Sequence, residues 1–113
     1  MNPNDINTDA LVVLCTCPER ITAEKIAKQL VEQHLAACVN IINDMTSVYV
    51  WDNETKFEVE AQLIIKTSAA RMEEMKNHII NVHPYDNPEI IALPIVDGNE
   101  NYLQWVLEST QIK

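Results

Sequence analysis

Glycine is almost absent from this sequence, because Gly98 is the only one among 113 residues. The phosphate-binding loops of Walker and Rossmann proteins need several glycines so that the backbone can approach the phosphates closely. Neither loop can be built from this composition. The sequence therefore excludes the usual nucleotide-binding enzymes.

Basic residues are also few, with 8 Lys and Arg against 17 Asp and Glu and a formal net charge of −9. These basic residues are scattered along the chain, whereas binding to nucleic acid phosphates needs clustered positive charge. An acidic surface attracts cations weakly and selects no particular metal. We therefore expect no nucleic acid partner.

Long apolar runs are missing too. No run approaches the roughly 20 residues that a membrane-spanning helix requires, so we expect no transmembrane segment. The first nine residues, Met1–Asp9, are polar and acidic, and they lack the basic and apolar regions of a secretory signal. We expect a flexible N-terminal tail over residues 1–9, one domain over residues 10–113, and a cytoplasmic protein.

Cysteine occurs three times, at Cys15, Cys17 and Cys38. An odd number of cysteines in a chain without an export signal makes a disulfide framework improbable. The expected state is a set of reduced thiols, which either pack as small apolar side chains or bind a metal.

The first elements that the pattern predicts are a strand and a helix. A continuous apolar run from Leu11 to Cys17, ended by Pro18, indicates a buried strand. Thr22 is a candidate N-cap, with Glu24 in the first turn of the helix. The buried side of this helix follows the spacing of an amphipathic helix, at Ala23, Ile26, Ala27, Leu30 and Val31.

A β-hairpin is predicted next. Residues 38–51 are rich in β-branched side chains, and a polar turn follows at residues 52–55. The next strand alternates, so every second side chain shares one face. The apolar face of this strand consists of Phe57, Val59, Ala61, Leu63 and Ile65.

A second helix, a strand and a third helix complete the pattern. Ser68 is a candidate cap for the second helix, whose buried side carries four apolar residues, Met72, Met75, Ile79 and Val82. Two prolines prevent a helix over residues 83–88. Residues 89–96 return as a strand, with Pro94 at a sheet edge, and a last short helix follows Gly98.

The predicted order is β-α-β-β-α-β plus a terminal helix, an α+β arrangement of the ferredoxin-like type. Both main helices would then cover one face of a four-stranded sheet. The first strand is apolar on both sides, and Ile42 and Ile64 make the opposite face more apolar. Such a face is typical of a subunit interface, so we expect self-assembly. The alternative is that the terminal helix alone covers this apolar face of the sheet.

Five segments, in order along the chain, resemble one known family. They are Leu35-Ala36-Ala37-Cys38, Ser47-Val48-Tyr49-Val50-Trp51, Glu60 with Lys66-Thr67, His83-Pro84-Tyr85-Asp86-Asn87-Pro88-Glu89-Ile90, and Tyr102-Leu103-Gln104-Trp105. Each segment alone is a weak signal, but all five in register are specific. Together they look like the CutA divalent-cation tolerance family over about residues 11–107.

This resemblance implies a tight homotrimer of ferredoxin-like subunits, with the sheets facing a threefold axis, and a role in tolerance of copper and other divalent cations. Some members are described as copper binders through the cysteine of the first strand and the histidine of the His-Pro-Tyr motif. Those positions are Cys15 and His83 here. Several members carry a second histidine directly before the motif, where this chain has Val82.

The residues themselves leave two interpretations of the candidate copper site open. Cys15 and Cys17 are two apart on a strand, so their sulfurs share a face, with Thr16 opposite. Thiolate and imidazole suit copper, and thiolate suits Cu(I) in particular. His83 begins a rigid loop, and we expect it to be partly exposed. The alternative to a metal site is that the cysteines are ordinary core residues and that His83 is solvated.

An enzymatic function is not favoured. The same fold plan hosts small hydrolases with a phosphate-binding arginine loop, and Arg20 has the right place in the chain. That loop lacks glycine, and Glu19 would repel an anion. Cys15 with His83 could form a nucleophile and base, but no third, orienting group is identifiable.

A different function class is a ligand-sensing trimer. Ferredoxin-like trimers of the PII signalling type bind small effectors in clefts between subunits. Aromatic and charged residues suited to such a cleft are Tyr49, Trp51, Glu60, Lys66, Tyr85 and Glu89. The alternative is that these residues pack at a subunit interface, with Glu60 and Lys66 paired.

Overall fold

The computed structural model describes residues 8–112, so most of the tail predicted over residues 1–9 lies outside the described residues. The elements are β1 (Ala10–Cys17), α1 (Arg20–Glu32), β2 (Cys38–Trp51), β3 (Glu54–Ser68), the short 3₁₀ helix η2 (Ala69–Arg71), α2 (Met72–Val82), β4 (Ile90–Pro94) and α3 (Glu100–Ser109). The predicted order of strands and helices is confirmed.

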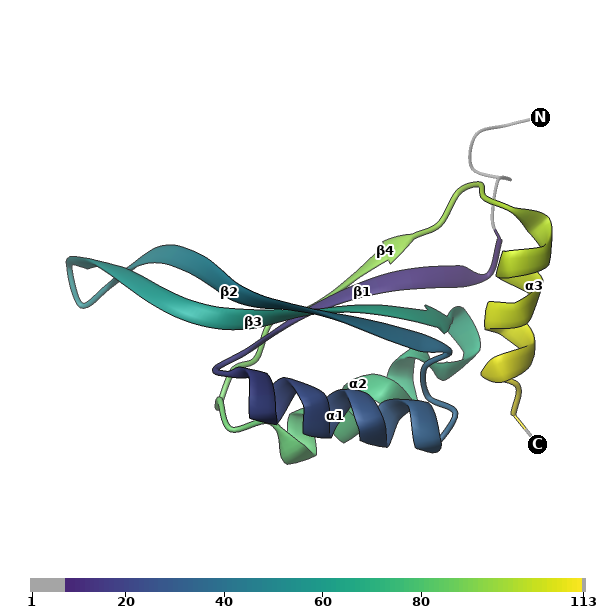
Figure 1. The fold of residues 1–113 in the computed structure, drawn as a ribbon, viewed down its shortest axis with the longest axis horizontal. Coiled ribbons are helices and arrows are strands. Elements are labelled where there is room, and N and C mark those ends of the chain that lie inside the picture. The colour runs from purple at the N-terminus through teal and green to yellow at the C-terminus, as the bar shows by residue number, and fades with distance from the viewer. Residues whose placement is uncertain (1–7, 113) are drawn as a thin grey trace.

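The four strands form one sheet in the order β2-β3-β1-β4, and all neighbours are antiparallel. Helices α1 and α2 lie together under one face of the sheet, and α3 stands at its end (Figure 1). This is the predicted ferredoxin-like α+β arrangement. Pro94 ends the edge strand β4, where its missing N–H group costs no ladder hydrogen bond.

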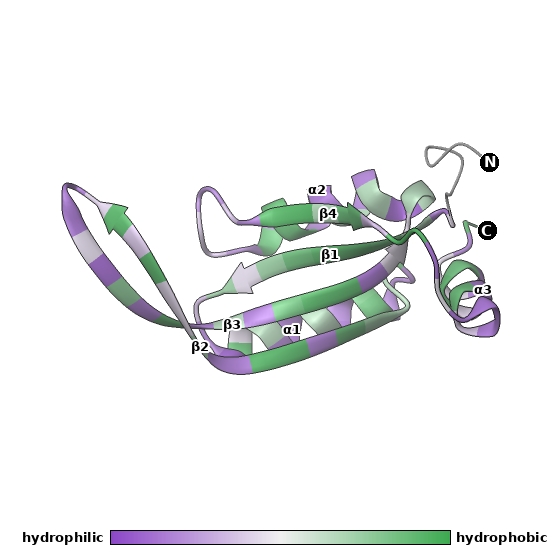
Figure 2. Ribbon diagram, turned by 90° about the horizontal axis from the view of Figure 1, so that it is seen from above, coloured by the Kyte–Doolittle hydropathy of each residue, from purple (hydrophilic) through white to green (hydrophobic). Residues whose placement is uncertain are grey.

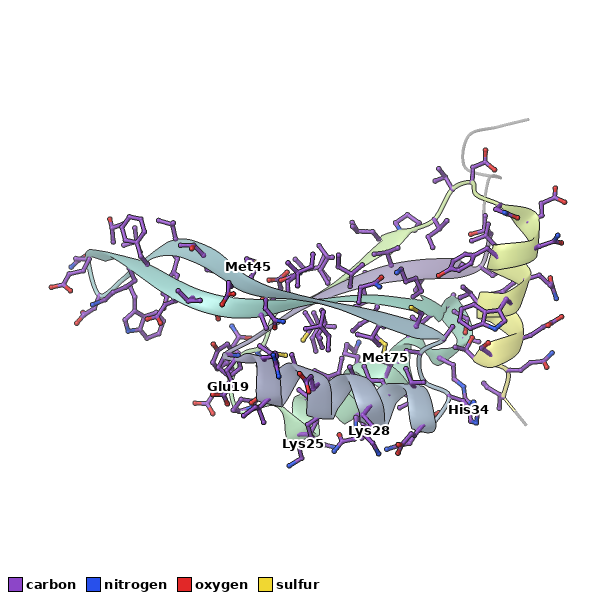
Figure 3. All side chains as sticks on the ribbon, viewed as in Figure 1. Glu19, Lys25, Lys28, His34, Met45 and Met75 are labelled. Atoms are coloured by element: carbon purple, nitrogen blue, oxygen red, sulfur yellow. The ribbon has the colours of Figure 1, made fainter. Side chains whose placement is uncertain are left out.

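The main core lies between the sheet and the two helices. The alternating side chains of β1 and β3 point into it, and α1 and α2 supply the other wall. Its fully buried members include Val13, Leu63, Ile65, Leu30, Met75 and Ile79. Each such side chain contributes about 1.5–3 kcal/mol through burial. Figure 3 shows Met75 in this layer, while Lys25 and Lys28 point away from the sheet on the far side of α1.

The start of α1 differs from the prediction. The helix begins at Arg20 with Glu19 as its N-cap, three residues before the predicted cap. Thr22 lies inside the first turn, and its hydroxyl donates to Glu19 Oε1 at 3.0 Å. The backbone N–H of Ala23 donates to the Glu19 carbonyl, which starts the helical ladder there. Val31, the last residue of the predicted buried side, is exposed.

The start of α2 also differs. Ser68 precedes η2 rather than α2, and its hydroxyl makes no capping hydrogen bond. That hydroxyl oxygen is buried without a partner among the described residues. The 3₁₀ turn delays α2 to Met72, with Arg71 at its N-cap. Val82, at the other end, is exposed instead of buried.

The β2–β3 hairpin reaches far beyond the helices (Figure 1). Asp52 and Asn53 form its tight turn, with φ values of 54° and 63°, as a two-residue hairpin loop with left-handed backbone requires. The turn is therefore shorter than the predicted one at residues 52–55. Phe57 and Val59, predicted to share the buried face, are 71% and 64% exposed because no helix lies beneath them.

A β-bulge interrupts the hairpin near its base. Ile42 pairs with Gln62, but the next pair on the same face joins Met45 and Glu60, so β2 holds one extra residue between the two pairs. Asp44 in this bulge has a φ of 57°, a left-handed conformation that Asp tolerates better than most residues. The sequence pattern did not predict this bulge.

The bulge reverses which side chains of β2 face which side of the sheet. Beyond it, Tyr49 and Trp51 stand on the same face as Glu60, the face opposite the helices. Unbroken alternation from Ile42 would have placed both aromatic rings on the other side. The hairpin consequently presents Tyr49, Trp51 and Glu60 on one face.

We call the face covered by α1 and α2 the inner face, and the opposite one the outer face. Strands β1 and β4 consist largely of apolar residues (Figure 2), and Ile42, Ile91 and Leu93 on the outer face are each about half exposed. Helix α3 packs at the end of the sheet (Figure 1), where Val106 clusters with Ala10 and Ala37. The terminal helix therefore leaves most of the apolar face uncovered. None of the helices within residues 8–112 has the length and apolarity that crossing a membrane demands.

Candidate metal centre and adjoining cavity

Cys15, Cys17 and His83 meet at the inner face of β1. One ligand atom from each residue lies within 4.8 Å of the other two. Both cysteines are fully buried free thiols, while Cys38, the third, is half-buried and not part of this cluster. The i, i+2 spacing on β1 gives the two sulfurs a common face, as predicted. His83 is only 8% exposed, so the prediction of a partly exposed histidine is wrong.

His83 is buried because both ring nitrogens have partners. The backbone N–H of Tyr85 donates to Nδ1 at 3.0 Å. Nε2 of the neutral ring then carries the proton and donates to the carbonyl of Thr16 at 2.8 Å. The two bonds hold the loop after α2 against β1. A metal ion can use this imidazole only by replacing one of them.

The two thiols differ in acidity. A hydrogen bond to Cys17 raises the pKa of the Cys15 thiol far above its ordinary value, and burial raises it further. The same bond lowers the pKa of Cys17, against the opposing effect of burial. Cys15 therefore stays protonated near neutral pH, and Cys17 is the more acidic thiol. A metal bound by both sulfurs must displace protons.

Thr16 connects this cluster with the outer face. Its carbonyl accepts from His83, while its side chain points the opposite way. The hydroxyl lies 2.5 Å from Glu89 Oε2 and 2.8 Å from Gln62 Oε1. A hydroxyl has one proton and therefore donates to one of these oxygens at a time. A single strand residue thus separates the thiol cluster from the acidic groups above it.

A cavity of about 640 Å³ lies where the hairpin meets the loop after α2. It is lined by Tyr49, Trp51, Glu60, Pro84, Tyr85, Asp86 and Asn87. An adjoining hollow shares several of these residues and adds Thr16, Ser47 and Glu89. Four of the six residues predicted for a ligand cleft therefore line one cavity, and Glu89 borders the hollow beside it.

Lys66 is the exception among the predicted cleft residues. It pairs with Cys38 in the sheet, six residues along β3 from Glu60. Its ammonium group donates to the side chain of Asn40. The structure does not bring Lys66 to the cavity, and the suggested pair between Glu60 and Lys66 does not form.

Tyr85 anchors the cavity wall. Its hydroxyl donates to Glu60 Oε2 at 2.6 Å, and its ring packs against His83 with 4.9 Å between the ring centroids. Partial burial raises the pKa of the Tyr85 phenol strongly, and the hydrogen bond to Glu60 raises it further. The phenol therefore remains a neutral donor that holds the Glu60 side chain at the aromatic wall.

Sequence reasoning missed some members of both sites. Cys17 was not proposed as a ligand, although its spacing from Cys15 already placed the two sulfurs on one face. Asp86 and Asn87 belong to the motif that carried the family resemblance but were not singled out. Their place at the cavity depends on the path of the loop, and no local pattern encodes that path.

The comparisons with known proteins agree with one another. The family described as CutA1 divalent ion tolerance protein matches residues 11–109. The divalent-cation tolerance protein CutA of Thermus thermophilus is 46% identical over 99 residues, which are 88% of this chain and 96% of that protein.

Two solved structures extend this result. CutA1 from Oryza sativa is 37% identical, with a TM-score of 0.90, over 96% of this chain and 100% of that one. A protein from Archaeoglobus fulgidus, described as the periplasmic divalent cation tolerance protein CutA, is 33% identical, with a TM-score of 0.86, over 90% and 99%. The chain therefore belongs to the family of CutA1 divalent ion tolerance proteins.

Proposed function

We propose that this protein acts in metal tolerance by capturing copper at Cys15, Cys17 and His83. The observation that carries the proposal is the convergence of two sulfurs and one imidazole nitrogen within 4.8 Å. Thiolate and imidazole donors suit copper, and paired thiolates favour Cu(I). Family membership supports the wider role, because the family is described by tolerance of divalent ions and not by a reaction.

The two sulfurs are the leading donors in this proposal. The two thiols hydrogen-bond to each other, whereas His83 must give up its bond to Thr16 or to Tyr85 before it can bind an ion. Burial keeps water and competing ligands away from the thiols. Protons compete with the metal for the sulfurs, so affinity should decrease as the pH falls.

Anaerobic titration with Cu(I) against a competing chelator tests the copper site. We expect one equivalent per chain, and a loss of affinity of about tenfold or more in Cys15→Ser and in Cys17→Ser. His83→Ala should cause a smaller loss. Cys38→Ser is the matched control, because Cys38 lies outside the cluster, and it should bind like the wild type. Unchanged affinity in both Cys15→Ser and Cys17→Ser would place the site elsewhere.

We also propose that the protein is a homotrimer in the cytoplasm. Support comes from the apolar outer face, where Ile42, Ile91 and Leu93 are about half exposed. Exposed apolar patches of this kind mark interaction surfaces in soluble proteins. Sedimentation equilibrium at micromolar concentration tests the assembly, and a monomer mass would reject it. Cell fractionation tests the location, since the Archaeoglobus fulgidus relative is described as periplasmic.

A second candidate function is effector binding in the cavity. The observation in its favour is that Tyr49, Trp51, Glu60 and Tyr85 line one cavity of about 640 Å³. That volume falls in the range of small-molecule sites. A ligand that binds the native state raises the melting temperature, so a thermal-shift screen of metals, nucleotides, amines and organic acids separates this function from metal capture.

A further inference from the structure

The cavity gathers an unusual share of the aromatic side chains. Three of the six Trp, Tyr and Phe residues of the chain line it. Trp51 is 69% exposed, Tyr49 41% and Tyr85 37%. The bulge in β2 turns Tyr49 and Trp51 towards the face of Glu60. Ring faces therefore remain available to a molecule that enters the cavity.

The charges at the cavity have one sign. Glu60 and Asp86 lie in its wall, and Glu89 borders the adjoining hollow. Within the described part of the chain, neither lining contains a Lys or an Arg. Lys56, which pairs with Tyr49 across the hairpin, has its ammonium group 2.9 Å from Glu54 Oε2. Adjacent carboxylates produce a negative potential that attracts cations and repels anions.

The carboxylate nearest the rings is held in place. Tyr85 donates to Oε2 of Glu60 at 2.6 Å, and its phenol stays protonated because its pKa is raised by burial and by Glu60. No donor to Oε1 of Glu60 is found among residues 8–112. This second oxygen can accept a hydrogen bond from a guest.

An inorganic cation does not fit these observations. Such ions need several ligand atoms close together. In the described chain, the only group of three or more potential ligands with that spacing is the cluster of Cys15, Cys17 and His83. A cavity of about 640 Å³ instead has room for a small organic molecule.

We propose that this cavity binds a small organic ammonium ion. Its N–H groups donate to Glu60 and Asp86, and its positive charge lies over the faces of Tyr49 and Trp51, where the ring quadrupole attracts cations. This inference rests on the second candidate function, effector binding, and names the chemical class of the effector. It is independent of the copper site.

Calorimetric titration with three matched probes tests the inference. Putrescine, butanediol and succinate share a four-carbon chain, but they end in ammonium, hydroxyl and carboxylate groups. Putrescine should bind about tenfold or more tightly than butanediol, with an affinity that decreases as salt increases. Succinate should not bind.

Variants assign the binding to the cavity. Glu60→Gln and Trp51→Ala should each weaken putrescine binding by about tenfold. If Glu60→Gln fails to fold, Asp86→Asn removes the other negative charge of the cavity wall at an exposed side chain, and it should also weaken putrescine binding. The matched controls are Glu100→Gln and Trp105→Ala on α3, outside the cavity, and both should bind putrescine like the wild type.

The outcomes distinguish failure of the ammonium class from failure of the effector site itself. Equal binding of putrescine and butanediol rejects recognition of a cation. Succinate binding that Trp51→Ala abolishes rejects the ammonium class but keeps an effector site. If none of the three probes binds to the assembled wild-type protein, the ammonium site is rejected. This result is also expected if another copy of the chain fills the cavity.

Discussion

Two groups of functional side chains lie on opposite sides of Thr16 and differ in most physical properties. The inner group, Cys15, Cys17 and His83, is buried, and His83 is held by hydrogen bonds to the backbone. The outer group around Glu60 is exposed, acidic and aromatic. The inner group belongs to the folding core, so changes there should cost stability. The outer group is less buried, so changes there should cost less stability and act mainly on binding.

The largest expected effect is at His83. His83→Ala removes both ring hydrogen bonds and leaves a buried gap, so we expect a loss of about 2–4 kcal/mol in the free energy of unfolding. Urea unfolding at fixed protein concentration measures it. The control is His34→Asn at an exposed site with a φ of 59°, which Asn tolerates. Equal losses in the two variants would contradict the structural role of His83.

A smaller loss is expected at Cys15. Cys15→Ser places a hydroxyl in a fully buried position and should cost about 1–3 kcal/mol. Cys38→Ser, at a half-buried thiol, should change the free energy by about 0.5 kcal/mol. Thermal and urea unfolding of both variants give the comparison. A larger loss at Cys38 would show that the inner cluster is not part of the rigid core.

Thr16 tests whether the two groups act separately. Thr16→Val keeps the shape of the side chain and the carbonyl that binds His83, but removes the hydroxyl beside Glu89. We expect a loss of about 1 kcal/mol and unchanged copper affinity. Thr46→Val, on the exposed hairpin, is the matched control for stability. Weakened copper binding in Thr16→Val would mean that the two sides are coupled through this residue.

The smallest effect on stability concerns Tyr85. Because its pKa is raised in the folded protein, the unfolded chain loses the phenolic proton at a lower pH than the folded chain. Stability should therefore decrease slightly as the pH rises above the ordinary pKa of tyrosine. The pKa values of Tyr49 and Tyr102 are raised as well, so an absorbance titration of tyrosinate should show that Tyr85→Phe removes the latest of the ionisations and that Glu60→Gln shifts it to lower pH. An unchanged latest ionisation in Tyr85→Phe would contradict this assignment.

The inner group was more accessible to sequence reasoning than the outer one. Two cysteines two residues apart on an apolar strand must share a face, and local geometry alone provides that result. The burial of His83 was not predictable, because it depends on the carbonyl of Thr16, 67 positions away in the sequence. The element order and the ferredoxin-like arrangement followed from apolar periodicity and were confirmed.

The outer group shows where sequence patterns stop being informative. Tyr49, Trp51, Glu60 and Tyr85 were predicted as cleft residues from residue type and family resemblance, and the structure brings them to one cavity. Lys66 has a suitable residue type but lies at the wrong position along β3. Which residues reach the cavity depends on the register of β2 against β3, and a single extra residue in β2 sets that register.

The bulge between Ile42 and Met45 depends on the length of this stretch more than on its composition. Deleting Asn43 would remove the extra residue, so that β2 could pair with β3 by strict alternation. Met45 would stay opposite Glu60 and Tyr49 opposite Lys56, and both aromatic rings would keep their side of the sheet. Among related chains, a one-residue gap here should therefore accompany a regular hairpin without the bulge and an unchanged pattern of aromatic residues along the arm.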